Sequence, residues 1–285
     1  MQILALRAGR LAVDLAPSAG GSIARFVAGD AFDVLRPASM DAIASGRGND
    51  ASCYPLVPFS NRIANGRLAV DGEEIVLAPN WPGVRHPMHG DGWARLWTVE
   101  RHDACSADLV YSHGGREGWP FRYRARQSFR LEEDRLAIGM AIENLEIRAV
   151  PAGLGLHPFF TRESDSELAC RVQGVWRTDA EVLPLEHMPV PPEWDFSVSR
   201  PVDGVVLDNC FDGWDGQAAI TWPRRGLRLH LAASEPFRHL VIYSPEARPF
   251  FCVEPVSHAS GAVGRSLLAA GATLAGEIVF RLSSL

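Results

Sequence analysis

The feature that most constrains this chain is an alternation of apolar and polar residues with a period of two. Between Phe121 and Leu131 mostly apolar residues take every second position, and after a charged turn the alternation resumes from Leu136 to Ile142. Successive side chains of a β-strand point to opposite faces, so this pattern predicts an antiparallel hairpin with one buried face. We expect the solvated face of its first strand to carry four arginines: Arg122, Arg124, Arg126 and Arg130.

The same alternation recurs in shorter stretches at 11–15, 67–77, 227–231 and 274–282. Asp71 and Gly72 separate two of these runs, and Asp-Gly suits a tight hairpin turn. Helical periodicity is scarce, with short helical turns expected only near 38–45 and 181–187. We therefore predict an all-β fold, a large antiparallel β-sandwich that forms a single domain over residues 1–285.

Composition excludes several classes of partner. The net charge of −6 and the pI near 5.9 argue against a nucleic-acid-binding surface, which is usually basic. No apolar run approaches the ~20 residues that span a membrane. Five scattered cysteines without a CxxC pair are typical of a reducing compartment and give no disulfide framework. The expectation is a cytoplasmic protein with neither nucleic-acid nor membrane partners; the sequence leaves the oligomeric state open.

A histidine in an apolar stretch marked by proline is the first candidate for chemistry. Residues 153–160 read GLGLHPFF, with His157 directly before Pro158. Proline disfavours helix at the residue before it, so we expect His157 to be extended, at the end of a strand or in a turn. The alternative is a half-buried structural histidine. The choice between a catalytic and a structural role for His157 depends on the other polar residues in similar apolar, proline-marked stretches.

A glutamate in a comparable setting is the second candidate. Residues 250–261 read FFCVEPVSHASG and place Glu254 between an apolar run and Pro255. Loss of solvation there would raise the pKa of the carboxyl group above its ordinary value of about 4.3, which suits a general base near neutral pH. The alternative is a structural glutamate in a buried ion pair, for example with Arg62. His258, in the same stretch, has an open role.

Two loops carry further polar candidates. The loop at 54–67 holds Asn61 and Arg62, and arginine offers fixed donors to hydroxyl or carboxylate oxygens; a salt-bridged surface loop is the alternative. The loop at 86–93, HPMHGDGW, holds His86 and His89. Their spacing does not place both rings on one face, and no third ligand lies close in sequence, so we expect no metal. The role of His86 is left open.

An aspartate after an apolar run completes the set. Residues 205–214 read VVLDNCFDGW and contain Asp208. Asp212 and Asp215 lie in glycine-rich turns and are better explained as turn formers. Asp208 is therefore the preferred buried acceptor, with a structural role as the alternative. The sequence has no nucleotide-binding loop and no nucleophile elbow, so no cofactor is expected.

Taken together in chain order, these stretches resemble the aldose 1-epimerase (galactose mutarotase) family. The pieces that match are Asn61-Arg62-Ile63, His89-Gly90, His157-Pro158-Phe159 and Glu254, and Asp208 fits the position of the family's aspartate. Residues 91–92 and 255–258 depart from the galactose-acting branch, which suggests a different substrate pocket. Asp203, Asp212 and Asp215 remain alternatives to Asp208.

The resemblance implies a galactose mutarotase-like supersandwich and an isomerase of carbohydrate metabolism. Its activity would interconvert the α and β anomers of a free aldose by acid/base ring opening and closure, without a cofactor or metal. By analogy, Glu254 is the general base, His157 is the general acid, and Asn61, Arg62, His89 and Asp208 bind the sugar. A hexose-phosphate epimerase, a metal-dependent lyase using His86 and His89, and a non-catalytic sugar-binding module remain alternatives; the preferred aldose and the pathway are left open.

Overall fold

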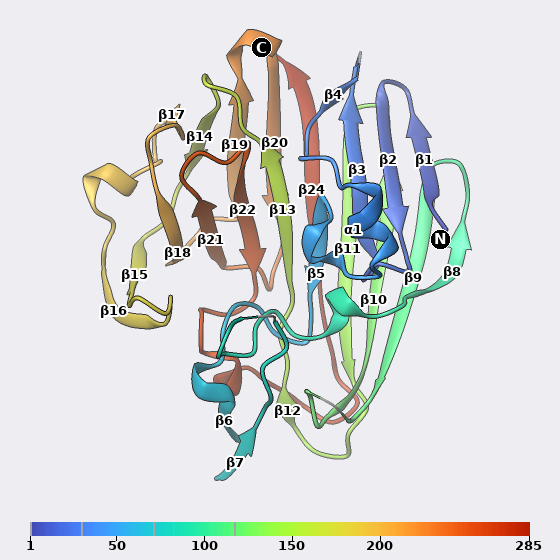
Figure 1. Ribbon diagram of the computed structural model, residues 1–285, viewed down its shortest axis with the longest axis vertical. Helices are drawn as coiled ribbons and strands as arrows, with labels where there is room; N and C mark the ends of the chain where they lie inside the picture. The colour runs from blue at the N-terminus through green and yellow to red at the C-terminus, as the bar shows by residue number, and fades with distance from the viewer. Residues whose placement is uncertain (1, 30, 71, 82, 117) are drawn as a thin grey trace.

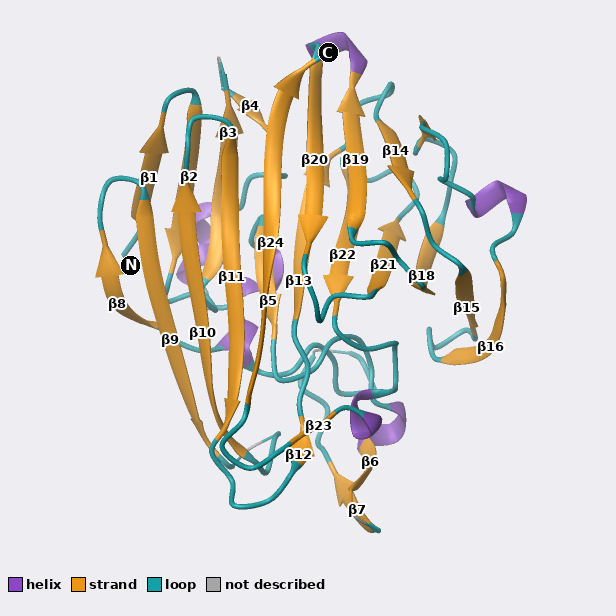
Figure 2. Cartoon of the chain, turned by 180° about the vertical axis from the view of Figure 1, so that it is seen from behind, coloured by secondary structure: helices purple, strands orange, loops and turns teal. Residues whose placement is uncertain are grey.

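The computed structural model describes residues 2–29, 31–70, 72–81, 83–116 and 118–285. In this part of the chain strands dominate, and two large antiparallel sheets lie one behind the other (Figures 1 and 2). The alternating sequence therefore folds as expected: each sheet buries one face against the other.

The first sheet has eleven strands among the described residues. In spatial order these are β1 (Leu4–Ala8), β2 (Leu11–Ala16), β3 (Ser22–Ala28), β5 (Cys53–Leu56), β13 (Gly155–Thr161), β22 (Phe250–Val256), β21 (His239–Ser244), β18 (Leu207–Asp212), β15 (Gly174–Thr178) and β16 (Pro184–Pro189), with β4 (Phe32–Asp33) paired to β3. The central strands β5, β13 and β22 come from distant parts of the sequence.

The second sheet has nine strands in the same described ranges. Their order is β17 (Arg200–Pro201), β14 (Glu167–Cys170), β19 (Gln217–Trp222), β20 (Leu227–Ala233), β24 (Thr273–Ser284), β11 (Arg135–Asn144), β10 (Arg122–Leu131), β9 (Ser106–Gly114) and β8 (Thr98–His102). Two small pairs, β6 (Arg67–Val70) with β7 (Glu73–Val76) and β12 (Val150–Pro151) with β23 (Leu267–Leu268), lie outside both sheets.

Helical segments are short. They are α1 (Met40–Ala44) and the 3₁₀ turns η1 (Gly48–Asp50), η2 (Ala64–Gly66), η3 (Gly92–Ala94), η4 (Pro192–Trp194), η5 (Pro223–Arg225) and η6 (Val263–Arg265). Ser39 caps α1 by accepting a hydrogen bond from the Ala42 N–H at 3.1 Å, as serine commonly does at a helix start. No helix among the described residues is long and apolar enough to cross a bilayer.

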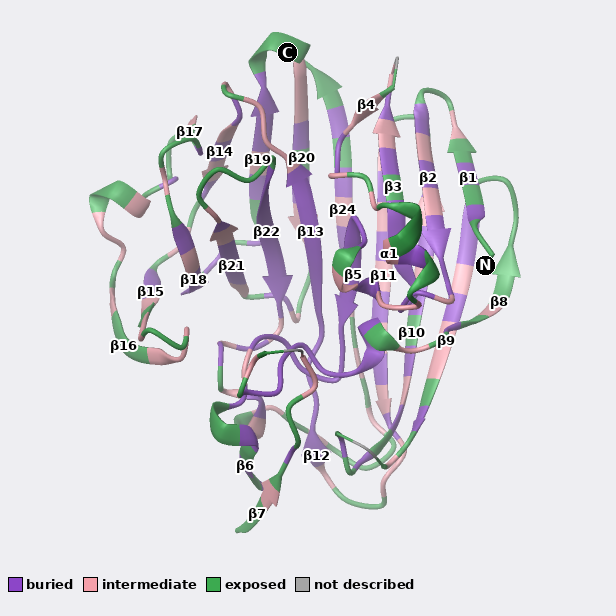
Figure 3. Ribbon diagram, viewed as in Figure 1, coloured by how far each residue is buried: buried purple, intermediate pink, exposed green. Residues whose placement is uncertain are grey.

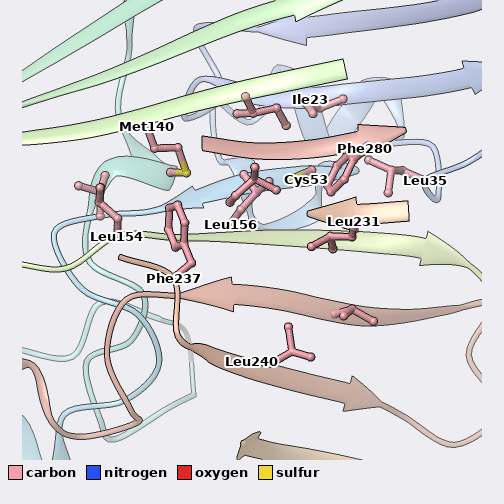
Figure 4. Close-up of a cluster of buried hydrophobic side chains, with 14 of the residues drawn as sticks. Ile23, Leu35, Cys53, Met140, Leu154, Leu156, Leu231, Phe237, Leu240 and Phe280 are labelled. Atoms are coloured by element: carbon pink, nitrogen blue, oxygen red, sulfur yellow. The ribbon is translucent and has the colours of Figure 1, made fainter. Parts of the chain in front are cut away.

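The main core lies between the two sheets. Leu156 of β13 and Ile23 of β3 contribute from the first sheet, and Phe280 of β24 and Met140 of β11 contribute from the second (Figure 4). A second apolar cluster, which includes Tyr54, lies on other residues of the central strands. Because β13 and β22 alternate between these two clusters, their side chains are buried on both faces (Figure 3).

The predicted hairpins are confirmed. In the pair β10–β11, Leu131 lies opposite Leu136 and Phe129 opposite Ile138. The arginines of the polar face form ion pairs on the surface, for example Arg130 with Asp108 at 2.7 Å. The 67–77 hairpin is also present as β6–β7. In its turn Gly72 has a positive φ, and Asp71 lies outside the described residues.

One expected helical turn is present and the other is wrong. The turn near 38–45 is α1. The stretch 181–187 does not form a helical turn, because residues from 184 onward belong to the edge strand β16, which pairs with β15. The side chain of Asp179 accepts hydrogen bonds from the N–H groups of Glu181 and Leu183, which forms a tight turn. Pairing with β15 then outweighs a weak local preference for helix.

Candidate functional site

The centre of the candidate site is fixed by the pairing of β13 with β22. Gly155 lies opposite Val256 and Phe159 opposite Cys252, so the register places His157 directly across from Glu254. Facing residues of an antiparallel pair share one side of the sheet. Pro158 and Pro255 lack an N–H group, so they cannot donate to the ladder where these two residues face each other. His157 is extended, as expected, but it lies inside a strand instead of at a strand end.

His157 and Glu254 are in direct contact. The distance between His157 Nε2 and Glu254 Oε1 is 3.3 Å, and both side chains are buried. The imidazole ring stacks on Tyr54 of the neighbouring strand and on Phe159, with ring centroids 4.6 Å and 4.5 Å away. These contacts hold the ring against the carboxyl group. The buried ion pair with Arg62 that the sequence left open for Glu254 is therefore replaced by a contact with His157.

Burial shifts the acid/base properties of both groups toward their neutral forms. The pKa of Glu254 is raised well above its ordinary value, mainly by burial and then by the nearby Asp208, as the sequence predicts. The pKa of His157 is lowered to about 3, mainly by burial and then by the positive charge of Arg36. Burial thus favours the form of the pair in which the Glu254 carboxyl group holds the one proton and the His157 imidazole is neutral. Transfer of that proton across the 3.3 Å contact gives a carboxylate that can take a proton and an imidazolium that can give one.

His89 is held in an unusual backbone conformation. Both His89 and Asn61 have positive φ angles, 64° and 56°, which non-glycine residues adopt mainly at functional sites and turns. The His89 N–H donates to the carbonyl of Asn61, and the Asn61 N–H donates to Nδ1 of His89. Nδ1 is thus an acceptor, and burial lowers the pKa of this histidine well below normal. The neutral ring carries its proton on Nε2, where it can donate to a ligand.

Asn80 fixes the same loop from the other side. Its side-chain amide donates to the carbonyls of Met88 and Gly90 at 2.9 Å and 2.7 Å, and its oxygen accepts from the Met88 N–H at 2.7 Å. The three bonds bracket His89. Asn80 was not predicted from the sequence, because its role depends on backbone groups of another loop.

A polar network behind His89 ties its loop to the second sheet. The carboxylate of Asp91 accepts hydrogen bonds from Tyr111 and Tyr123, lies 3.0 Å from Arg95 Nε and lies 3.1 Å from His113 Nδ1. Burial alone would raise the pKa of Asp91, but His113 and Tyr123 outweigh it and the pKa is lowered. Burial likewise opposes the charge on His113, but Asp91 raises its pKa overall. Asp91 therefore holds a buried ion pair.

Asp91→Asn is expected to destabilise the fold strongly. It keeps the size of the side chain but leaves the charge of His113 without its partner, which typically costs about 3–5 kcal/mol. Tyr111→Phe, the matched control, removes one hydrogen bond to the carboxylate and should cost less, about 1.5–3 kcal/mol. Denaturant unfolding measures both. The pKa of His113 is raised in the folded state, so its ion pair with Asp91 stabilises the fold fully below the unfolded pKa of about 6.5. This stabilisation is lost as the pH rises through the pKa of His113 in the folded state.

The Asp91→Asn deficit should therefore shrink as the pH is raised through the titration of His113. A loss of stability no larger than that of Tyr111→Phe, or a deficit that grows with pH, would contradict this account of the network.

The remaining predicted residues form two groups: one lines the cavity, and the other holds the backbone of loops outside it. Arg62 and Asp208 line the cavity above His157 and Glu254 together with Asn61 and His89. The pKa of Asp208 is raised by burial, an effect that Arg62 partly offsets. The alternative aspartates lie elsewhere: among the described residues, the cavity lining includes Asp208 but none of Asp203, Asp212 and Asp215.

His86 and His258 serve the backbone of loops. Nδ1 of His86 accepts from the Asn65 N–H at 2.9 Å, and its Nε2 lies 3.6 Å from Glu181. Nε2 of His258 accepts from the Ser60 N–H at 3.2 Å, and burial lowers the pKa of this histidine to about 4. Neither residue lines the cavity in the described part of the chain, whereas His89 does.

The cavity encloses about 470 Å³, close to the size of small-molecule pockets. Several lining residues were not predicted from the sequence: Arg36, Asn49, Asp50, Tyr54, Trp81, Tyr243 and Arg248. Trp93, the last residue of the 86–93 loop, is buried and donates to the Gly90 carbonyl. Trp81 packs against it at 4.8 Å between ring centroids and forms the aromatic wall instead.

Three potential metal donors come together in the described part of the site. The donor atoms of His157, Cys252 and Glu254 lie within 4.8 Å of one another. Burial raises the pKa of the Cys252 thiol well above its usual range, and metals bind the thiolate. Binding of a metal ion by these three donors would therefore require the thiol to lose its proton.

Known proteins share this fold and sequence. A crystal structure of a candidate aldose 1-epimerase from Escherichia coli superposes with a TM-score of 0.92 at 32% identity, covering 100% of this chain and 99% of that one. The aldose epimerase homologue of Caenorhabditis elegans superposes with a TM-score of 0.85 at 17% identity, covering 100% and 99%. The fold is thus that of the galactose mutarotase-like β-sandwiches.

Sequence relatives place the chain more closely. The profile of the aldose 1-epimerase family matches residues 2–281. YphB, an uncharacterised protein of Escherichia coli, is 34% identical over 267 residues, which cover 91% of this chain and 89% of that protein. The aldose 1-epimerase of Escherichia coli is 27% identical over 136 residues, 46% of this chain and 37% of that enzyme. The chain belongs to the aldose 1-epimerase family.

Proposed function

We propose that this protein is an aldose mutarotase, an isomerase that interconverts the α and β anomers of a free sugar. The observation that carries the proposal is the contact of His157 with Glu254, 3.3 Å apart at the base of a polar cavity. The two oxygens that exchange protons during mutarotation, O1 and O5, are bonded to the same carbon. An acid and a base that serve them must therefore be neighbours, and these two groups are.

The reaction requires one proton to be taken and another to be given. The single proton of the pair first passes from Glu254 to His157 across their contact. The carboxylate of Glu254 then takes the proton from the hydroxyl on C1, the C1–O5 bond breaks, and the imidazolium of His157 gives its proton to O5. The open aldehyde rotates about the C1–C2 bond, and the reverse steps close the ring on the other face of the carbonyl. Each proton transfer of this kind typically contributes about 100- to 10,000-fold. The pair holds one proton before and after each cycle.

The other cavity residues bind and orient the sugar in this proposal. Nε2 of His89 donates to a sugar oxygen, since its Nδ1 is already engaged by Asn61. Arg62 donates to hydroxyl or ring oxygens, and Asp208 accepts from hydroxyl groups. Trp81 offers an apolar face for the C–H groups of a pyranose. The chemistry as written uses no cofactor.

The setting of the enzyme is part of the same proposal. We infer that residues 1–285 act as one domain and that the protein works in the cytoplasm. The five cysteines are all free, which suits a reducing compartment. Its partner is a small sugar.

Anomer exchange measured by NMR or by optical rotation tests the proposal directly. Freshly dissolved α-glucose or α-galactose, and their 6-phosphates, should reach anomeric equilibrium faster with the protein than without it, and a chelator should not change the rate. A sugar that binds in calorimetry without faster exchange would favour a non-catalytic sugar-binding module. Loss of activity with the chelator would point to a metal-dependent reaction.

A further inference from the structure

Arg36 lies against the reacting pair but belongs to none of the motifs that the sequence singled out. It follows β4, and its N–H donates to the carbonyl of Phe159 on β13 at 2.8 Å. Its guanidinium carbon lies 4.1 Å from the ring centroid of Phe159 and 4.9 Å from that of Phe250. The ring of His157 also stacks on Phe159. Arg36 and the acid/base pair thus share one aromatic neighbour.

The charge of Arg36 has no close counter-ion among the described residues. Nη2 donates only to the main-chain carbonyls of Asp50 and Ala51, and the buried Nε has no hydrogen-bond partner in the part of the chain described. Burial lowers the pKa of this arginine, although Asp50 acts in the opposite direction. A desolvated cation is costly unless an anion faces it.

A second arginine adds to the positive charge at this end of the cavity. Arg248 also lines the cavity, is exposed, and repels the charge of Arg36. Asn49, which lines the same wall, has a buried side-chain oxygen without a hydrogen-bond partner among the described residues. Asp50 also lines the cavity and attracts the charge of Arg36, but no ion pair joins them among the described residues, and Arg248 adds a second positive charge. An anionic ligand with a neighbouring hydroxyl group would face both arginines and donate to the oxygen of Asn49.

We propose that the aldose taken by this site carries an anionic group, a carboxylate or a phosphate, which Arg36 binds with the help of Arg248. This inference rests on the proposed mutarotase function and names its substrate class. Arginine suits the task because its planar fork of donors matches the oxygens of either group. Arg36, His157 and Glu254 line the same cavity, so C1 of a sugar can lie at the acid/base pair while another part of the same molecule meets Arg36.

The test compares kcat/KM for anomer exchange of glucose, glucuronate and glucose 6-phosphate at fixed ionic strength. One anionic sugar should exceed glucose by about 10-fold or more, and its identity separates carboxylate from phosphate. Arg36→Met should reduce that preference by about 10- to 100-fold, as expected for losing a hydrogen bond to a charged group. Arg36→Lys, which keeps the charge, should restore part of it, and Arg248→Met should show a smaller loss.

Arg171→Met is the matched control, because Arg171 is exposed and does not line the cavity in the described part of the chain. It should leave the preference for the anionic sugar unchanged. The inference is overturned if glucose is preferred, or if Arg36→Met leaves the ratio of anionic to neutral sugar as it was. Because the readout is a ratio of rates within one variant, a general loss of folded protein does not mimic it.

A separate binding measurement distinguishes failure of this inference from failure of the proposed function. Calorimetry with the Glu254→Gln variant compares the affinities for the same three sugars without any reaction. If no sugar exchanges but an anionic one binds more tightly than glucose, the mutarotase proposal fails and the anion site stands. If glucose exchanges rapidly and the anionic sugars bind no better, the anion site fails and the mutarotase proposal stands.

Discussion

Glu254→Gln is expected to slow anomer exchange by about 100- to 10,000-fold, the usual contribution of a positioned acid/base group. The amide keeps the size and the hydrogen-bonding ability of the side chain but cannot take a proton from the hydroxyl on C1. The loss should appear in kcat more than in KM, because the sugar still meets Arg62, His89 and Asp208. Exchange NMR at several sugar concentrations separates the two parameters.

The stability of the same variant provides an independent check. Burial raises the pKa of Glu254 well above its normal value, which means that the folded state disfavours the ionised carboxylate. A neutral amide removes that penalty, so the melting temperature of Glu254→Gln should be no lower than that of the wild type; active-site residues often oppose stability in this way.

Glu186→Gln is the matched control for Glu254→Gln. Glu186 lies on the edge strand β16, exposed and paired with Arg177, and the substitution there should alter neither rate nor stability appreciably. If Glu254→Gln folds normally and exchanges anomers as fast as the wild type, Glu254 is not the general base and the proposed mechanism is wrong.

The strand content of the fold was predictable because its signal is local. The alternation from Phe121 to Ile142 sets which side chains are buried, and a charged turn between the runs determines the pairing of Leu131 with Leu136. The stretch at 181–187 shows the limit of such reasoning. There the strand forms because β15 offers it a partner, and a single segment carries no information about its partner.

The candidate site was predictable in its parts but not in its geometry. Apolar surroundings and an adjacent proline correctly marked His157 and Glu254 as buried polar residues. Their contact depends on the pairing of β13 with β22, two strands far apart in the sequence. Arg36 and Asn80 carried no such mark, since both lie near turns and acquire their partners only when loops fold over the sheet.

His157→Asn is expected to slow exchange by about 100-fold or more, because the group that gives a proton to O5 is lost. His230→Asn is the control: His230 lies on β20 of the second sheet and is exposed, so its replacement should leave the rate unchanged. Circular dichroism and the melting temperature establish that both variants fold. A rate in His157→Asn within a few-fold of the wild type would assign the second proton transfer to another group or to water.

The pH dependence of the wild type distinguishes this pair from an ordinary histidine acid. The pKa of His157 is lowered to about 3 and that of Glu254 is raised well above its ordinary value, so the imidazole does not titrate where an ordinary histidine does. We therefore expect kcat/KM to show no step at the ordinary pKa of a histidine and to fall on the alkaline side, where the pair loses its proton at the raised pKa of Glu254. An isolated histidine would instead give a step near its ordinary value of about 6.5, and such a step would show that His157 titrates independently of Glu254.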